Sequence, residues 1–373
     1  MTTSLRRIAR APSRVVLSAY VPARTASWPA NSRLFVVGDE VGWSIDDDAQ
    51  RLRAAARRLG YQVAPTEWAR FARDQAVFVH DHFGALRPRW VESSHRLGLS
   101  YFHGRPGTPG HPEFDAVLER LRRFAGRVDG VQVTHAEMHE LVANAGVAET
   151  KIFRIPIGVE LERFALGDAR ARAEARSQLG LPSTAFVVGS FQKDGVGWED
   201  GLEPKLIKGP DVLVATLERV QRTIPELEVL LTGPARGYVR RALEQLEIPY
   251  RHFRLPSRGD LATAYHALDA YLTTSRQEGG PKASFEATAA GAPLVTTRVG
   301  QAQELLADGE DALLADVDDA EALATGLQRV YEDADLAARL RTNGRAKAEL
   351  FSEQRLDERW AQLLDRLVRR GAG

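Results

Sequence analysis

Two carboxylates eight residues apart flank a glycine-proline turn in the C-terminal half of the chain. Glu278 precedes Gly279-Gly280-Pro281, and Glu286 follows within a run of helix-forming residues, 283–290, that Gly291 ends. The pattern predicts a loop entering a helix, with Glu278 at the turn and Glu286 one turn deeper. Amides at a helix start can hold an anion, and carboxylates accept hydrogen bonds from paired hydroxyls. Together they predict a nucleotide-sugar site, although each acid could also be an ordinary surface charge.

Lys208 could supply positive charge to the same ligand. It follows an irregular stretch, 192–207, and precedes a helix that we expect to begin near Pro210, because proline suits the first turn of a helix. A cation and a helix amino terminus would converge there. Both would stabilise a bound anionic group.

Three histidines fall near predicted strand ends in the N-terminal half. His103 ends the run 99–103, and a lone histidine there is either structural or faces a ligand. His80 and His82 could suggest a metal, but no cysteine or carboxylate cluster completes such a site, so we expect no metal. Acids 46–48 suit the first turn of a helix capped by Ser44 better than a metal site.

The elements that must position these residues alternate between strand-like and helix-like segments. In the first half we expect strands at 34–38, 61–64, 76–79, 99–102 and 130–134, with helices at 46–60 and 136–145. In the second half we expect strands at 185–189, 227–232, 270–272 and 293–296, with helices at 211–223 and 238–246. This order predicts an α/β protein with two doubly wound, Rossmann-like halves.

A polar stretch after Val159 favours a domain boundary near Phe164. We therefore expect an N-terminal domain, 1–164, and a C-terminal domain, 165–350. Residues 351–373 would contain an amphipathic helix that packs back on the body.

Composition limits the class of protein. The 373 residues are 44% hydrophobic, 50 basic residues balance 50 acidic ones, and the absence of cysteine excludes disulfides and thiolate chemistry. No apolar run approaches the roughly 18 residues of a membrane span, and arginines interrupt residues 5–14 too often for a signal peptide, so we expect a cytoplasmic protein. The first half carries a basic excess that could contact an anionic membrane or acceptor, or could be a solvated terminus. It begins with Arg6, Arg7, Arg10, Arg14, Arg24 and Arg33.

Other function classes lack their motifs. The chain has no dinucleotide fingerprint, no phosphate-binding Walker loop and no Gly-x-Ser-x-Gly elbow. Its basic residues lack the aromatic interleaving and one-faced clustering typical of nucleic-acid binding. We expect no nucleic-acid partner.

The second half resembles the family-4 retaining glycosyltransferases, which have the GT-B fold. The likeness covers about residues 130–350 and is fainter before them. It is carried by Ile157–Phe164, Lys208-Gly209, Leu230–Pro234, Glu278–Glu286 and Pro293–Gly300. The resemblance implies two Rossmann-like domains that face one another across a cleft. The N-terminal domain, 1–164, would bind the acceptor, and the C-terminal domain, 165–350, would bind the nucleotide sugar.

The resemblance also implies roles for individual residues. Glu278 would contact the hydroxyls of the donor sugar, Glu286 the ribose, and Lys208 the phosphates. His103 would face the reacting sugar, and Gly233 would lie under the nucleotide base. The residues expected beside the diphosphate are Gly279, Gly280, Pro281 and Lys282, and the N-terminal glycine loop, which could contact the acceptor or the leaving phosphate, holds Gly38 and Gly42.

One position departs from the family pattern. Ser190 stands after Gly189, where the family usually has an arginine, and the loop that follows is longer. A second cation for the donor is therefore unassigned, and Lys193 and Lys205 are the candidates.

The implied activity is retaining, metal-independent transfer of a sugar, without a cofactor, from a nucleoside-diphosphate sugar to an acceptor hydroxyl. His103, Lys208 and Glu278 would act in catalysis. The acceptor could be a glycan, a lipid-linked glycan or a small molecule. Two alternatives are another GT-B enzyme, such as a nucleotide-sugar epimerase or a phosphorylase, and a catalytically silent subunit that binds a sugar nucleotide.

Overall fold

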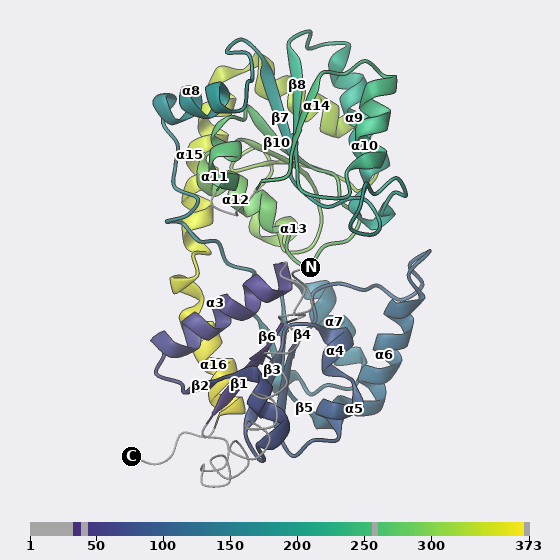
Figure 1. Ribbon diagram of the computed structural model, residues 1–373, viewed down its shortest axis with the longest axis vertical. Coiled ribbons are helices and arrows are strands. Elements are labelled where there is room, and N and C mark those ends of the chain that lie inside the picture. Colours follow the sequence, from purple (N-terminus) through teal and green to yellow (C-terminus); the bar gives the residue numbers. More distant parts are fainter. Residues whose placement is uncertain (1–32, 39–43, 256–259, 369–373) are drawn as a thin grey trace, which may run out of the picture. The chain divides into compact units, whose positions relative to one another are not determined.

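The computed structural model describes residues 33–38, 44–255 and 260–368, and the chain divides into two compact units (Figure 1). The first unit is Met1–Ile155 with Leu356–Gly373, and the second unit is Pro156–Arg355. The division falls after Ile155 rather than near Phe164. Phe164 is fully buried and packs edge-on against Tyr265, so it belongs to the core of the second unit.

The first unit contains a sheet of six parallel strands in the order β2-β1-β3-β4-β5-β6. The strands are β1 (Leu34–Val37), β2 (Val63–Ala64), β3 (Ala76–Val79), β4 (Arg96–Ser100), β5 (Val128–Val133) and β6 (Ile152–Arg154). The α-helices are α3 (Ser44–Arg58), α4 (His82–Ala85), α5 (Pro88–Val91), α6 (Pro112–Phe124), α7 (Ala136–Asn144) and α16 (Asp357–Leu367).

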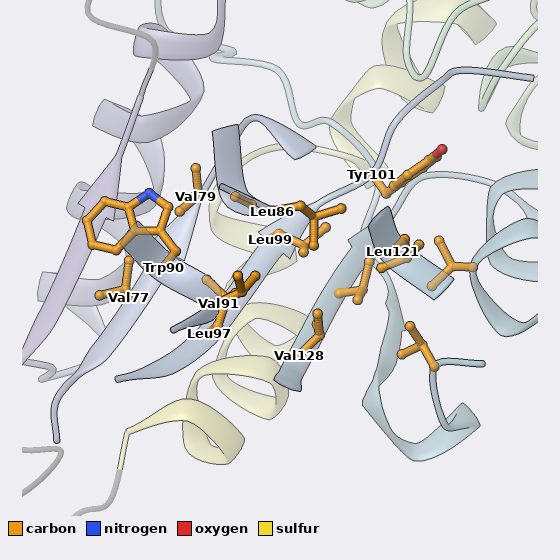
Figure 2. Packing of buried hydrophobic residues seen from close by; sticks show 14 of the residues in the cluster. Val77, Val79, Leu86, Trp90, Val91, Leu97, Leu99, Tyr101, Leu121 and Val128 are labelled. Carbon is orange, nitrogen blue, oxygen red and sulfur yellow. The ribbon is translucent and has the colours of Figure 1, made fainter. Parts of the chain in front are cut away.

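Helices cover both faces of this sheet, which explains why β1 and β3 are continuous apolar runs rather than alternating ones. On one face, Leu86, Trp90 and Val91 pack against Val77 and Leu97, as Figure 2 shows. On the other face, α3 and α16 cover the sheet through the buried residues Leu52, Trp360, Leu363, Leu364 and Leu367. The C-terminal helix thus completes the core of the first unit.

The second unit repeats the plan with six parallel strands in the order β12-β11-β10-β7-β8-β9. The strands are β7 (Phe186–Ser190), β8 (Leu227–Thr232), β9 (Tyr250–Phe253), β10 (Ala270–Thr273), β11 (Leu294–Thr297) and β12 (Leu313–Ala315). The α-helices are α8 (Ala169–Gln178), α9 (Pro210–Gln221), α10 (Gly237–Gln245), α11 (Asp260–His266), α12 (Lys282–Ala290), α13 (Ala302–Leu305), α14 (Ala320–Glu332) and α15 (Ala334–Leu350). Helices α9, α10 and α14 cover one face, and α8, α11 and α12 cover the other (Figure 1), while α15 contributes buried residues to both clusters.

The strand order creates a switch point in each sheet. In the second sheet the chain proceeds outward from β7 to β8 and β9, then returns to place β10 on the other side of β7. Open parallel sheets bind ligands outside the carboxyl ends of the strands where the order reverses. The loops after β7 and β10 are therefore the expected ligand site of the second unit, and those after β1 and β3 hold the same place in the first.

Several elements differ from the sequence-based expectations. The polar stretch 169–178 forms α8, which buries Ala175 and the side chain of Arg176 but otherwise has a weak apolar stripe. Strands β6, β9 and β12, which lie at sheet edges, were not predicted. Within the described residues, no helix is long and apolar enough to cross a membrane.

Candidate functional site

The loops after β7 and β10 meet at the switch point of the second sheet. The Gln192 side-chain amide donates to the main-chain oxygen of Lys208 at 3.0 Å. The Ser275 hydroxyl lies 3.0 Å from Gln192 Oε1 and 2.9 Å from Glu278 Oε1. A hydroxyl has one hydrogen, so Ser275 donates to one of these oxygens at a time. The network joins Gln192 and Lys208 to Ser275 and Glu278, which lie in a segment distant in sequence.

Lys208 and Glu278 form an ion pair at the centre of this network. Lys208 Nζ donates to Glu278 Oε1 at 2.6 Å, and their side chains are 21% and 10% exposed. Charge-assisted hydrogen bonds are stronger than neutral ones, and partial burial reduces their screening by water and salt. The sequence predicted both residues for one site, and the structure brings them together.

The turn before α9 brings Lys208 to this position. Lys208 ends a 3₁₀ turn, Leu206–Lys208, and Gly209 then adopts a left-handed conformation with φ 62° before α9 begins at Pro210. A Cβ atom on Gly209 would overlap the main-chain oxygen of Thr274, whose hydroxyl donates to Gly209 O at 2.8 Å. Only glycine fits both constraints, so the turn is locked against the loop after β10.

A second anchor holds the same turn from the side. The Arg276 guanidinium donates to both carboxylate oxygens of Asp211, at 2.8 and 2.6 Å, and to Leu206 O at 2.7 Å. Bidentate arginine-carboxylate pairs fix geometry as well as contribute energy. Arg276 therefore ties the first turn of α9 to the segment that carries Glu278.

Glu286 lies on α12 and is 4% exposed, so its interpretation as a helix-surface charge is wrong. The fully buried Tyr265 donates its hydroxyl hydrogen to Glu286 Oε2 at 3.0 Å. A buried carboxylate needs hydrogen-bond partners, and this partner orients it. Glu286 is thus a held, inward-facing group.

The turn Gly279-Gly280-Pro281, which leads into Lys282 at the start of α12, rests on the buried Gln301. The Gln301 amide nitrogen of the main chain donates to Gly279 O at 3.0 Å, and its side chain exchanges two hydrogen bonds with the main chain of Ile157, at 2.7 and 3.1 Å. A Cβ atom on Gly280 would lie 2.7 Å from Gln301 Oε1. The close approach explains why glycine stands there.

Ser190 ends β7 and is buried, and the guanidinium of Arg236 lies close to it. Arg236, from the turn after β8, donates to Ser190 O at 2.6 Å and pairs with Asp194 at 2.9 Å between Nε and Oδ1. Both side chains of that pair are 0% exposed. The guanidinium lies beside the residue that replaces the family arginine, but it arrives from another part of the sequence.

The two candidate lysines lie in the segment between β7 and the turn before α9. Lys193 Nζ lies 4.1 Å above the centroid of the Trp198 ring, a cation-π contact, and burial lowers the pKa of Lys193. Lys205 is half-buried, and its amide donates to Asp194 O at 2.8 Å. Contact of either lysine with a diphosphate stays a prediction.

Gly233 follows β8 with φ 87°, a conformation suited to glycine. Its amide donates to Phe253 O at 3.0 Å, and its carbonyl oxygen lies 2.7 Å from His252 Nε2. Burial lowers the pKa of His252, so the ring is neutral at neutral pH and donates through Nε2. The turn predicted under the base is thus fixed by β9.

In the first unit, His103 lies three residues beyond the end of β4 in a cluster of rings. Its ring centroid is 5.8 Å from that of His82 and 5.7 Å from that of Phe114. His82 is buried against Tyr101, and burial, with the nearby His103 and Arg120, holds its pKa well below the ordinary value. The cluster stands at the carboxyl edge of the sheet.

His80 and His82 have different surroundings. His80 packs against Phe78 and Trp360 and bonds the Ser100 hydroxyl at 3.1 Å, whereas His82 begins α4 and stacks on Tyr101. Across the described ranges, no three His, Cys, Asp or Glu side chains are grouped so that they could hold a metal.

The glycine loop of the first unit is described only at its start. Gly38 follows β1 at the switch point, and a Cβ atom there would overlap the Asp46 carboxylate. Asp46 and Asp47 stand in the first turn of α3, as the sequence predicts. Gly42 and the arginines before Arg33 lie outside the described residues.

Residues 202–347, which contain Lys208, Glu278 and Glu286, match the family model described as "Glycosyl transferases group 1". The second unit thus contains a region, 202–347, that is similar to this family's domain, and we refer to this region as the group 1 domain. The ion pair at the switch point and the buried glutamate lie within it.

Curated relatives extend the likeness beyond the group 1 domain. The D-inositol 3-phosphate glycosyltransferase of Corynebacterium urealyticum is 27% identical over 262 residues, which are 66% of this chain and 58% of that protein. The protein of the same name from Xylanimonas cellulosilytica is 32% identical over 247 residues, 63% of this chain and 55% of its own length. The chain thus matches somewhat more than half of each relative.

Solved structures resemble the whole fold. The crystal structure of Anabaena Alr3699/HepE in complex with UDP and glucose aligns with a TM-score of 0.70 and 16% identity, over 90% of this chain and 100% of that one. Sucrose-phosphate synthase from Thermosynechococcus elongatus aligns with a TM-score of 0.67 and 20% identity, over 90% and 98%. The predicted GT-B fold class, with two doubly wound Rossmann-like domains, is confirmed.

Sequence reasoning missed five residues that support the group 1 domain's site. Gln192 and Ser275 could have been suspected, because each lies two residues beyond a strand that flanks the switch point. No local signal marks the others, since their partners are distant in sequence. These are Arg236, Tyr265 and Gln301.

Proposed function

We propose that the protein is a glycosyltransferase that moves a sugar from a nucleoside-diphosphate sugar to an acceptor hydroxyl. The observation that carries this proposal is the Lys208–Glu278 ion pair at the switch point of the group 1 domain, with Glu286 buried on the helix that follows. A cation and two carboxylates in this arrangement suit a diphosphate between two sets of hydroxyls.

Each residue has a proposed part in donor binding. Lys208 would release part of its contact with Glu278 and bind the phosphates, while Glu278 accepts hydrogen bonds from the sugar. Glu286 would accept from the ribose, and amides of the Gly279-Gly280-Pro281 turn would lie beside the diphosphate. His103 would act on the acceptor side. In the protein without donor, the Lys208–Glu278 ion pair keeps both side chains oriented for binding.

The proposed chemistry retains the anomeric configuration and needs no metal or cofactor. The bond between the anomeric carbon and the diphosphate oxygen breaks, and the acceptor oxygen bonds to that carbon. The departing diphosphate takes the acceptor proton, while Lys208 stabilises the developing negative charge. Exclusion of water would limit hydrolysis of the donor.

Related proteins indicate which donor and acceptor to test first. A related fold holds UDP and glucose, so UDP-glucose is the first donor to test. The relatives named D-inositol 3-phosphate glycosyltransferase make that phosphate the first acceptor, beside lipid-linked glycans and small alcohols.

The test measures release of nucleoside diphosphate with and without acceptor, over UDP-, GDP- and dTDP-sugars. We expect acceptor-dependent release that EDTA does not abolish, and a product with the donor's anomeric configuration by NMR. Lys208→Ala and Glu286→Ala should lose most turnover. Lys347→Ala is the matched control, because Lys347 pairs with Asp311 at 3.1 Å and is 26% exposed, similar to Lys208.

Three outcomes would contradict the proposal. Near-normal transfer by both folded site variants would refute the site assignment. Conversion of the donor without an acceptor alcohol, or with free phosphate, would favour an epimerase or a phosphorylase. Donor binding without turnover over a broad acceptor panel would favour a silent binding subunit.

A further inference from the structure

The segment 191–205, between β7 and the turn before α9, is an ordered hairpin. The Phe191 amide donates to the Tyr271 hydroxyl at 3.0 Å, and the Val196 amide donates to Glu203 O at 2.9 Å. An antiparallel bridge joins Gly195 to Pro204. We refer to residues 191–205 as the hairpin.

The tip of the hairpin covers the amino terminus of α10. The first amides of a helix lack partners within it. Here amides at the start of α10 donate to three consecutive carbonyl oxygens of the hairpin, at 3.1, 2.5 and 3.0 Å. The pairs are Ala235 with Glu199, Gly237 with Asp200, and Tyr238 with Gly201. Backbone lies so close to backbone that a Cβ atom on Gly201 would be 2.6 Å from Ala235 Cα.

The Asp194–Arg236 ion pair lies at the base of this contact. Arg236 donates to Ser190 O at 2.6 Å and Thr232 O at 3.2 Å, and its Nε is 2.9 Å from Asp194 Oδ1. One guanidinium therefore joins the ends of β7 and β8 to the hairpin. Because both side chains are 0% exposed, Arg236 acts by holding the hairpin rather than by touching a ligand.

The hairpin delivers Gln192 to the donor site. Gln192 lies two residues before Asp194, and it contacts Lys208 O and the Ser275 hydroxyl that approaches Glu278. We propose that the Asp194–Arg236 pair is a positioning element of the donor site, which fixes the hairpin and through it the alignment of Lys208 with Glu278. This inference rests on the proposed function, since it assigns those residues to the donor.

A second arginine-aspartate pair in the same unit supplies a matched control. Arg176 Nη2 lies 2.5 Å from Asp269 Oδ2, with side chains 5% and 20% exposed. Asp269 immediately precedes β10, so this pair stands at the amino edge of the parallel sheet, opposite the switch point. Its loss should destabilise the unit without disturbing the donor site.

The experiment compares two double variants, Asp194→Asn/Arg236→Met and Asp269→Asn/Arg176→Met, in the full chain. Affinity for UDP, GDP, ADP and dTDP is measured by calorimetry at a temperature where each variant is folded. We expect lower thermal stability in both, but a Kd for the bound diphosphate raised about tenfold or more only in the first. A folded first variant that binds within about twofold of wild type, or a control that weakens equally, would overturn the inference.

If the double variant does not fold, the single variant Arg236→Lys provides a second test. Lysine keeps the charge but cannot reach Ser190, Thr232 and Asp194 with one ammonium group in the arginine geometry. We expect limited trypsin digestion to cut this variant first after Lys193 or Lys205, and not to do so in wild type or in Arg176→Lys. An uncut hairpin with unchanged affinity would contradict the inference. If wild type binds none of the four diphosphates, the proposed function is refuted instead. Trypsin digestion would then still test whether Arg236 holds the hairpin.

Discussion

Removal of the Tyr265 hydroxyl, in Tyr265→Phe, tests whether Glu286 is held ready for a ribose. The hydroxyl donates to Glu286 Oε2 at 3.0 Å, and the two residues are 0% and 4% exposed, so bulk water does not replace the lost donor. A hydrogen bond to a charged group contributes about 1.5–3 kcal/mol to stability. A domain of this size loses about 2–4 °C in Tm per kcal/mol, which predicts a decrease of about 3–12 °C.

The same hydroxyl should affect ligand discrimination. Immobilising a flexible side chain on binding costs about 0.5–1.5 kcal/mol, and Tyr265 removes that cost by fixing Glu286 in advance. We expect wild type to prefer the ribonucleotide over its 2′,3′-dideoxy analogue by about 10- to 150-fold. In Tyr265→Phe this preference should shrink by about 2- to 12-fold.

The assay is calorimetric titration of both nucleoside diphosphates into wild type and variant, with thermal unfolding followed separately. Tyr331→Phe is the control, because the Tyr331 hydroxyl donates to Glu226 at 2.9 Å on an exposed surface of the same unit. It should change neither quantity beyond error. A Tyr265→Phe protein that is destabilised but keeps the full preference would refute the reasoning, since Glu286 would then be oriented by other groups or would not bind the ribose.

Three further predictions concern single residues. Lys208→Met should weaken binding of a nucleoside diphosphate by about tenfold or more and should change binding of the free nucleoside little, both measured by calorimetry. Equal losses of affinity for the two ligands would contradict a phosphate-binding role for Lys208. Gly209→Ala should lower Tm and donor affinity together, because its φ of 62° and the nearby Thr274 oxygen exclude a Cβ atom; an unchanged Tm would contradict this. Burial lowers the pKa of His82, so the unfolded chain binds a proton below about pH 6.5 that the native state does not, and acid should decrease the free energy of unfolding. His82→Phe should reduce the slope of the unfolding free energy against pH by the equivalent of up to about one bound proton, measured by urea unfolding between about pH 5 and 7. An unchanged slope would show that His82 titrates normally.

Elements that depend on neighbouring residues could be predicted from local patterns. Apolar runs predicted strands such as β1 and β3, because a parallel strand covered on both faces needs no polar alternation. Pro210 marked the start of α9 and Gly291 the end of α12, because proline suits a first helical turn and glycine a left-handed stop. The spacing of Glu278 and Glu286 likewise placed one acid in a turn and the other on a helix.

Local patterns failed where the stabilising contacts are distant. Helix α8 has a weak apolar stripe and holds its buried arginine by bonds to Asp269 and to the main chain of Ala267 and Ala185. A polar segment of this kind is interpreted as a linker when its tertiary contacts are unknown. The domain boundary near Phe164 depended on that reading.

Which side chains meet depends on the three-dimensional fold. Lys208 and Glu278 are joined because the chain returns to place β10 beside β7, and no periodicity in the sequence specifies strand order. The same order brings Gln192 to Ser275, while burial of Glu286 against Tyr265 distinguishes an inward carboxylate from a surface charge. Arg236 lies beside Ser190 because a guanidinium from the turn after β8 reaches the end of β7 across one strand spacing. Residue types and spacing are local properties, whereas partners depend on how the strands are ordered and which side chains are buried.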